Sequence, residues 1–244
     1  MRAIIIAGGK GRRLKPYTTL IPKPLVPINN KYSILEIILF QLSSQGFKHI
    51  TLAVNHMGKL MESFFGNGRK YGIKIDYSYE DKKLGTIAPI KNIKKLPNNF
   101  LVMNCDVLTN VNFAKLLNNH IKNKNIATIT SRLTDLKSEF GVIETQRNKI
   151  INFKEKPVIT QNVCIGVNCF NKEILKFIPS NKKFSFDDLL IKLIKNKIII
   201  NNYLFKGFWL DIGRPEDYDK INNEFKKNIK KFNISKSLIS NSNE

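Results

Sequence analysis

Residues 2–11 read Arg-Ala-Ile-Ile-Ile-Ala-Gly-Gly-Lys-Gly, an apolar run that ends in a glycine loop. The run at 2–7 is short and rich in β-branched residues, which predicts a buried strand. Glycines directly after a strand permit turns with φ > 0, in which backbone amides converge on an anion. The opening of the chain therefore predicts a first strand followed by a loop that suits a phosphate chain.

Downstream of this loop, buried strands alternate with helical patterns. We expect strands at 49–54, 73–79 and 100–103, and helices at 34–42, 60–65 and 113–121. Alternation of this kind is typical of a parallel sheet with helices on both faces and right-handed crossovers. The fold class predicted is α/β, a three-layer α/β/α Rossmann-like architecture with a mixed, mostly parallel sheet.

After about residue 126 the rhythm changes to strands at shorter spacing. We expect extra, partly antiparallel strands at 127–132, 141–144, 150–154, 163–170, 198–204 and 208–210, and helices at 172–177 and 187–195. Pro215, with two acidic residues behind it, predicts the start of a last helix. We expect one domain over residues 1–228 and a basic, frayed tail over 229–244.

The composition excludes several classes of protein. With 244 residues, 42% hydrophobic and 25% charged, the chain has the composition of a globular domain rather than a disordered or fibrous one. The sequence shows no signal peptide and no apolar run long enough for a membrane span, so a cytoplasmic protein without a membrane partner is expected. Three cysteines without a metal-binding spacing predict reduced thiols.

The net charge of +22 suits nucleic acid, an anionic membrane or phosphorylated small molecules. Lysine is abundant beside Asn and Ile throughout the chain, however, so most of this charge is interpreted as solvated surface. The sequence contains no pattern typical of an RNA-recognition domain, a helix-turn-helix or a zinc finger. A basic nucleic-acid-binding protein therefore stays an alternative, and we expect no nucleic-acid partner.

The glycine loop is followed by cations that would face a phosphate chain. Arg13 has the forked guanidinium that grips phosphate oxygens, and the pattern fits neither of the two common phosphate-loop motifs, GxxxxGK[ST] and GxGxxG. A tight surface turn with stray cations is the alternative interpretation. The candidate residues of this loop for nucleotide binding are Ala7, Gly8, Gly9, Gly11, Arg12 and Arg13.

The next segment, residues 18–28, reads TTLIPKPLVPI. Together with the loop it resembles the nucleotidyltransferases that make nucleoside-diphosphate sugars, whose opening pattern is GGxGTRLxPxTxxxPKPLxPI. Two prolines hold Lys23 on a preset backbone, so its ammonium loses little entropy on binding phosphates. Arg12 stands where the family commonly has Thr or Ser.

Four further segments resemble the family's motifs in the family's order. EDKKLGT at 80–86 resembles the segment that closes over base and sugar, which implies Glu80 and Gly85 as nucleotide-binding residues. FLVMNCD at 100–106 resembles a strand that ends in NGD, which implies Asn104 at the sugar and Asp106 as a Mg²⁺ ligand. WLDIGRPEDY at 209–218 resembles WxDIGxPxDY and implies Asp211 as the second Mg²⁺ ligand.

FKEKP at 153–157 resembles the family's FxEKP, which implies that Glu155 accepts sugar hydroxyls and that Lys156 neutralises the sugar phosphate. VCIGV at 163–167 resembles VNAGI, with Cys164 in the place of a sugar-contacting Asn and with Gly166 retained. Capping or surface roles are the alternative interpretations of the aspartates and of the charged cluster.

The resemblance implies the reaction NTP + sugar 1-phosphate → nucleoside-diphosphate sugar + pyrophosphate, in nucleotide-sugar biosynthesis. The implied catalytic residues are Arg13, Lys23, Asp106, Lys156 and Asp211, and the implied cofactor is Mg²⁺. GTP is favoured because the PYTT…PKPL…LGT pattern with Glu80 resembles the members of the family that use GTP, and because Glu80 could accept hydrogen bonds from guanine. Use of dTTP, UTP or CTP, or cytidylyl transfer to a phosphocholine-like or phosphonate acceptor, stays open, as do the sugar and assembly into a homo-oligomer.

Overall fold

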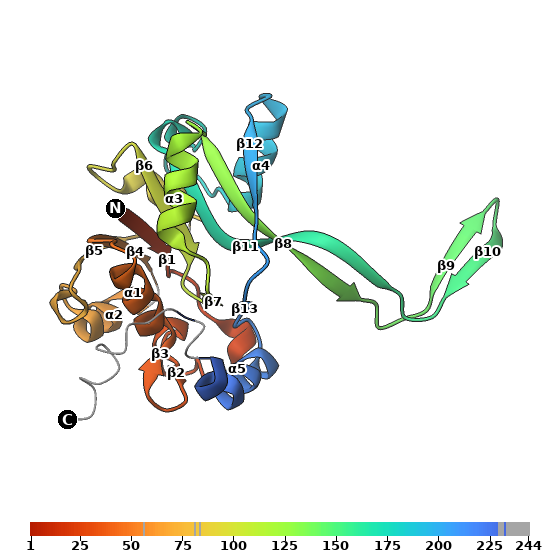
Figure 1. Ribbon diagram of the computed structural model, residues 1–244, viewed down its shortest axis with the longest axis horizontal. Helices are drawn as coiled ribbons and strands as arrows, with labels where there is room; N and C mark the ends of the chain where they lie inside the picture. The colour runs from red at the N-terminus through yellow and green to blue at the C-terminus, as the bar shows by residue number, and fades with distance from the viewer. Residues whose placement is uncertain (56, 81, 83, 229–231, 233–244) are drawn as a thin grey trace.

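A seven-stranded mixed sheet forms the centre of the computed structural model, which describes residues 1–55, 57–80, 82, 84–228 and 232 (Figure 1). Its order is β12-β8-β11-β6-β1-β4-β5. Only β11 runs antiparallel to its two neighbours, and the other pairs are parallel. The strands are β1 Arg2–Ile6, β4 His49–Val54, β5 Lys74–Tyr79, β6 Asn99–Asn104, β8 Ala127–Lys137, β11 Val158–Asn171 and β12 Ile200–Leu204.

Apolar side chains cover both faces of this sheet because successive residues of a strand point to opposite sides. Ile5 and Leu101 belong to a core cluster with residues of α1 (Ile34–Ser44), α2 (Gly58–Phe65) and α3 (Phe113–Lys122). Ile4 and Phe100 belong to a second cluster, with residues of α4 (Phe186–Lys195). The three-layer α/β/α fold predicted from the sequence is therefore confirmed.

Helix boundaries follow local signals in the sequence. Ser33 caps α1 and Ser185 caps α4, each in a reciprocal capping box with the residue three positions later. The last helix, α5 Pro215–Asn228, begins at the proline that predicts it. The segment Lys172–Lys176 is a 3₁₀ helix rather than the α-helix expected there, and four short 3₁₀ segments lie at Arg12–Leu14, Lys23–Leu25, Arg69–Tyr71 and Ala88–Asn92.

Strands β8 and β11 are longer than expected and continue beyond the sheet as a two-stranded ribbon (Figure 1). The ribbon ends in a hairpin made of β9 (Val142–Gln146) and β10 (Lys149–Lys154), which pair with each other in a separate sheet. Every residue of β9 and β10 is exposed. Residues 132–163 are called the arm below.

Two short pairings fold the C-terminal part of the chain back onto the first half. Strand β13 (Trp209–Asp211) pairs antiparallel with β7 (Val107–Thr109), directly after β6. A smaller pair, β2 (Pro27–Ile28) with β3 (Tyr32–Ser33), leads into α1, and the Tyr218 hydroxyl of α5 donates to the Pro27 carbonyl at 2.8 Å. Segments far apart in sequence thus meet at the end of β6.

The tail expected at 229–244 lies outside the described residues except for Phe232, whose ring is fully buried and packs edge-on against Phe208. Within the described part of the chain, no helix has the length and apolar character that crossing a bilayer requires.

Leu101 offers a direct test of the central strand, because its side chain is fully buried in the sheet. We expect Leu101→Ala to lower the free energy of unfolding by about 2–5 kcal/mol, the usual cost of the lost contacts and the cavity left behind. Urea denaturation of Leu20→Ala is the matched control, since Leu20 is 82% exposed. Equal midpoints for the two variants would contradict the core described here.

Candidate active site

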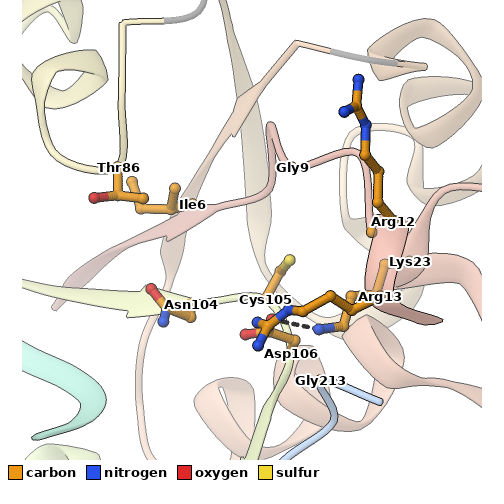
Figure 2. A pocket seen from close by; sticks show the side chains of 11 residues that line it. Ile6, Gly9, Arg12, Arg13, Lys23, Thr86, Asn104, Cys105, Asp106 and Gly213 are labelled. Carbon is orange, nitrogen blue, oxygen red and sulfur yellow. Dashed lines mark hydrogen bonds and ion pairs between the residues drawn. The ribbon is translucent and has the colours of Figure 1, made fainter. Parts of the chain in front are cut away.

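A cavity of about 310 Å³ opens at the carboxyl ends of β1 and β6 (Figure 2). In open α/β sheets this is the edge at which ligands bind. The cavity is lined by the glycine loop, by the 3₁₀ segments behind it and by the end of β6. Its lining residues are Ile6, Gly9, Gly11, Arg12, Arg13, Lys23, Thr86, Asn104, Cys105, Asp106 and Gly213.

The glycine loop at the edge of this cavity has backbone amides without a partner among the described residues. Gly11 has φ of 60°, and a Cβ there would lie 3.0 Å from Thr18 Cγ2, so both conformation and space favour glycine. No described residue accepts a hydrogen bond from the amides of Gly8, Gly9 or Gly11. Ala7 differs, because its N–H donates to the Ala53 carbonyl at 2.8 Å and is not available to an anion.

Lys23 enters the cavity from a short 3₁₀ segment that follows Pro22. Its ammonium lies 2.5 Å from Asp106 Oδ2, while the residue as a whole is only 7% exposed. Figure 2 shows this ion pair as the dashed contact at the centre of the site. The two residues are 83 positions apart, so the sequence alone does not place them in contact.

Asp211 reaches the same place through the β13–β7 pairing, in which it stands opposite Val107, and the Ile212 amide donates to the Asp106 carbonyl at 2.9 Å. Burial raises the pKa of Asp211, and the charge of Asp106 raises it further, whereas the charges of Lys23 and Arg13 oppose the shift. The two carboxylates predicted from distant motifs are therefore close enough to interact.

This pair has the donor chemistry for a hard cation. Oδ1 of Asp106 and Oδ1 of Asp211 are buried and have no hydrogen-bond partner among the described residues. Mg²⁺ prefers oxygen ligands and commonly takes only one or two protein carboxylates beside phosphates and water. The described residues hold no group of three or more His, Cys, Asp or Glu side chains suited to a metal, so two carboxylates fit Mg²⁺ better than a metal that needs an all-protein cage.

The two arginines of the loop differ in direction. In Figure 2 the Arg13 side chain extends toward Asp106, whereas Arg12 points away from it. A Cβ at Gly213 would lie 3.6 Å from Arg13 Nη2 and 3.7 Å from Asp211 Oδ2, which places Arg13 beside the second carboxylate. Neither arginine forms an ion pair with a described acidic residue. Arg13 is thus a cation available to a ligand.

A second cavity of about 280 Å³ adjoins the first and shares Thr86 and Asn104 with it. Gly166 has φ of 74°, and a Cβ there would lie 2.8 Å from Asn104 Nδ2, so glycine leaves room for that amide. The cavity is lined by Thr86, Asn104, Cys164, Gly166, Asn168, Phe186 and Asp187. The structure therefore brings Asn104, Cys164 and Gly166 together, as the resemblance implies.

Sequence reasoning missed four lining residues of this second cavity: Thr86, Asn168, Phe186 and Asp187. Thr86 is the last residue of the LGT segment at 84–86, and its place in that motif could have identified it as a site residue. Asp187 lies in the first turn of α4, and acidic residues there are common for reasons of helix stability alone. Nothing in its local sequence distinguishes it as a site residue.

Glu80 follows β5 and lies beside the glycine loop, since a Cβ at Gly8 would be 3.3 Å from Glu80 Oε1. Burial raises the pKa of Glu80, and the hydrogen bond from the Leu84 amide opposes that shift. Gly85 has φ of 105°, and a Cβ there would lie 2.5 Å from the Phe184 carbonyl oxygen. Packing against residue 184 therefore favours glycine at 85, and the predicted role of Gly85 in nucleotide binding stays a prediction.

Glu155 and Lys156 are not brought to the cavities. Both are exposed and follow β10 on the arm, which extends away from the sheet (Figure 1). Neither residue lines either of the two cavities of the described chain, and their predicted contact with a sugar phosphate stays a prediction.

Comparison with known proteins agrees with the geometry. Residues 2–228 match the family model described as nucleotidyl transferase. The D-glycero-α-D-manno-heptose 1-phosphate guanylyltransferase of Aneurinibacillus thermoaerophilus is 35% identical over 230 residues, covering 92% of this chain and 98% of the relative. The UTP–glucose-1-phosphate uridylyltransferase of Synechocystis is 32% identical over 239 residues, covering 89% of this chain, which spans only 61% of that relative.

A solved structure gives the same architecture. HddC from Yersinia pseudotuberculosis, complexed with GMP-PN, superposes with a TM-score of 0.72 at 26% identity, over 92% of this chain and 99% of that one. The similarity therefore extends over nearly the whole of both chains.

Asp211 gives a test of the site's electrostatics that needs no substrate. Because the folded state raises its pKa, ionised Asp211 destabilises the fold at neutral pH, and this cost vanishes as the pH falls below the unfolded-chain value of about 4. We expect Asp211→Asn to raise the urea midpoint of metal-free protein near neutral pH and the gain to shrink on acidification.

Glu173→Gln removes the same charge from an exposed surface pair with Lys176 and should leave the midpoint nearly unchanged. A midpoint for Asp211→Asn at or below that of the wild type at neutral pH would contradict the burial and charge crowding described.

Proposed function

Since the chain belongs to the nucleotidyl transferase family, we propose that it joins an NTP and a sugar 1-phosphate into a nucleoside-diphosphate sugar with release of pyrophosphate. GTP is the proposed donor. The observation that carries the proposal is the meeting of Asp106 and Asp211 with Lys23, beside a glycine loop with free amides. Amides and cations suit a triphosphate, and partner-free carboxylate oxygens suit its metal.

Asp106 and Asp211 would hold Mg²⁺, which supplies Lewis-acid polarisation of phosphate oxygens when bound. Their buried Oδ1 atoms have no described partner and are the ligand atoms proposed.

The reaction needs positioning and charge neutralisation more than covalent chemistry. An oxygen of the sugar phosphate attacks the α-phosphorus of the NTP in line, a new P–O bond forms, and the bond from the α-phosphorus to the bridging oxygen breaks. Pyrophosphate leaves with that electron pair. The nucleophile is already an anion, so no general base is required. The main requirement is for cations that offset the repulsion between the two anionic reactants.

Lys23 and Arg13 are the cations proposed for the β- and γ-phosphates. Lys23 is held by Asp106 in a nearly buried position, so its ammonium is preorganised and its desolvation has largely been met before the ligand arrives. Arg13 forms no ion pair with a described acidic residue and offers two parallel N–H donors to phosphate oxygens.

The second cavity is the proposed acceptor site, because it adjoins the proposed triphosphate site and shares Thr86 and Asn104 with it. Asn104 and Asn168 offer amide groups to sugar hydroxyls, and Asp187 offers a carboxylate. The guanylyltransferase relative that this chain covers almost completely acts on a heptose 1-phosphate, so a heptose or hexose 1-phosphate is the proposed acceptor.

Glu80 is the proposed reader of the base. It lies beside Gly8, and only one of its oxygens accepts a hydrogen bond from a described residue, the Leu84 amide at 3.3 Å. A carboxylate at this position would accept from N1–H and N2–H of guanine, whereas uracil has a single N–H on the same edge. The uridylyltransferase relative keeps UTP as the alternative donor.

We expect Asp106→Asn to lower pyrophosphate release by at least about a hundredfold, the scale seen when one group that stabilises transition-state charge is removed. The assay combines Mg²⁺, each common NTP and a panel of heptose and hexose 1-phosphates, with phosphocholine as a further acceptor. Glu173→Gln is the matched surface control. Wild-type turnover by folded Asp106→Asn would overturn the assignment of the metal site.

We expect Glu80→Gln to lower the rate with GTP about 10- to 100-fold relative to UTP, the cost of losing a charged hydrogen bond. The measurement is the ratio of kcat/KM for the two nucleotides in the wild type and the variant. Equal wild-type rates with GTP, UTP, CTP and dTTP would show that Glu80 does not select the base.

A further inference from the structure

The arm is a paired ribbon rather than a loose loop. Strands β8 and β11 continue from the sheet into the ribbon, with a register irregularity between Cys164 and Asn168 at the junction and regular pairs from there to Lys137 and Val158. At about 3.3 Å per residue, positions 132–137 alone carry the chain roughly 16–20 Å beyond the sheet, and the hairpin adds a similar length. Figure 1 shows the hairpin at the far end of this ribbon, so the ribbon carries Lys156 away from the cavities of its own chain.

The hairpin at the end of the arm has two different faces. Ile143 stands opposite Phe153 and Thr145 opposite Ile150, which gathers apolar side chains on one face. The other face is polar, with Glu144 accepting from Lys154 at 2.9 Å and from Asn152 at 3.2 Å. Ile143, Ile150 and Phe153 are 52%, 65% and 59% exposed. A two-stranded hairpin with a bare apolar face is marginal in water and usually packs against something.

The second cavity, in turn, is short of positive charge. The described residues that line it include the carboxylate Asp187 and no Lys or Arg. A sugar 1-phosphate carries two negative charges near neutral pH, and an unneutralised phosphate in a partly enclosed site is costly. The site is therefore incomplete in one chain, while Lys156 stands exposed and free of any described ion pair on the arm.

We propose that the hairpin packs by its apolar face onto helix α4 of a second copy of this chain, and that the arm thereby supplies Glu155 and Lys156 to the second cavity of that copy. The inference deepens the proposed function and rests on it for the acceptor. In a two-fold dimer each arm serves the other copy, so both sites are completed together.

Helix α4 has the matching surface. Asp187, Ile191 and Ile194 follow one another at spacings of four and three, which places them on one face of the helix. Ile191 is 52% exposed and Ile194 is 66% exposed, and Asp187 lines the second cavity. In the hairpin, Phe153 lies two residues before Glu155. Apolar contact of Phe153 with Ile191 would thus bring the Glu155–Lys156 pair within about one helical turn of Asp187.

A second copy fits the arm better than a polyanion does. Residues 132–163 carry six Lys or Arg and four Asp or Glu, so the arm is nearly neutral in a chain of net charge +22. A nearly neutral contact lets two strongly basic copies associate with little repulsion. The arm contains 32 residues, comparable to the roughly 20–30 residues that each partner contributes to a stable interface.

The decisive experiment is complementation between two damaged copies. One carries Asp106→Asn with an intact arm, and the other carries Lys156→Ala with an intact pocket. The two are expressed together with different tags, and the mixed dimer is purified over both tags. We expect each variant alone to be nearly inactive and the mixed dimer to recover about half of the wild-type rate, because one of its two sites has both intact parts.

Two outcomes of that experiment would overturn the proposal. An inactive mixed dimer would mean that the arm serves its own chain, and full activity of the Lys156→Ala variant alone would mean that Lys156 has no part in the site. Lys149→Ala, on the same hairpin, is the matched control and should retain wild-type activity.

The contact itself is tested by sedimentation velocity, which needs no substrate. We expect Ile143→Glu and Ile194→Glu to convert the dimer to monomer, and Gln146→Glu, on the polar face of β9, to leave it dimeric, all with unchanged circular dichroism. A monomeric wild type at assay concentration, or a dimeric Ile143→Glu, would overturn the proposed contact. Inactivity of the wild type with every substrate would instead contradict the proposed function. The sedimentation comparison of wild type and variants would still show whether the hairpin contacts α4 of a second copy.

Discussion

The carboxylate of Asp106, at the end of β6, is held by a partly buried ion pair with Lys23. One of its oxygens lies 2.5 Å from Lys23, and the other has no described partner. A buried ion pair contributes little net stability, because desolvation offsets most of the Coulomb attraction. Removing either charge would leave the other uncompensated in a partly buried position. The site therefore requires both charges, and the surrounding backbone holds Lys23 and Asp106 in contact.

Three separate segments meet at this ion pair. Gly11 turns with positive φ against Thr18, which brings the loop and Lys23 to the cavity. The β13–β7 pairing then returns the chain over about a hundred residues and adds Asp211. Burial, together with the charge of Asp106, raises the pKa of Asp211, so the ionised Asp211 carboxylate destabilises the metal-free fold. Such crowding of like charges is expected of a cation site and is hard to explain by stability alone.

Much of this could be predicted from the sequence, because the signals are local. The apolar run before Gly8 and the run before Asp106 each predict a strand that ends at the ligand edge of the sheet, and the prolines around Lys23 mark a fixed backbone. The packing of Gly85 against residue 184 could not be predicted, since that contact is long-range. Asp187 went unnoticed because an acidic residue in a first helical turn is ordinary.

The position of Lys156 could not be predicted for a different reason. The motif around Lys156 predicts a contact with a sugar phosphate. Whether Lys156 reaches that phosphate depends on the direction of the ribbon formed by β8 and β11. That direction is set by the sheet rather than by residues near 156. In one chain the arm leaves the site. The second copy inferred above removes the conflict between the motif and the fold.

The central claim, transfer at the α-phosphorus in the pocket around Asp106, is tested most directly with GTP labelled at its α-phosphate. The enzyme is incubated with Mg²⁺ and the best acceptor, and the products are separated and counted. The account predicts that the label appears in the nucleotide sugar, with one pyrophosphate released for each label transferred. Label in free GMP or GDP, or release of inorganic phosphate in place of pyrophosphate, would contradict it.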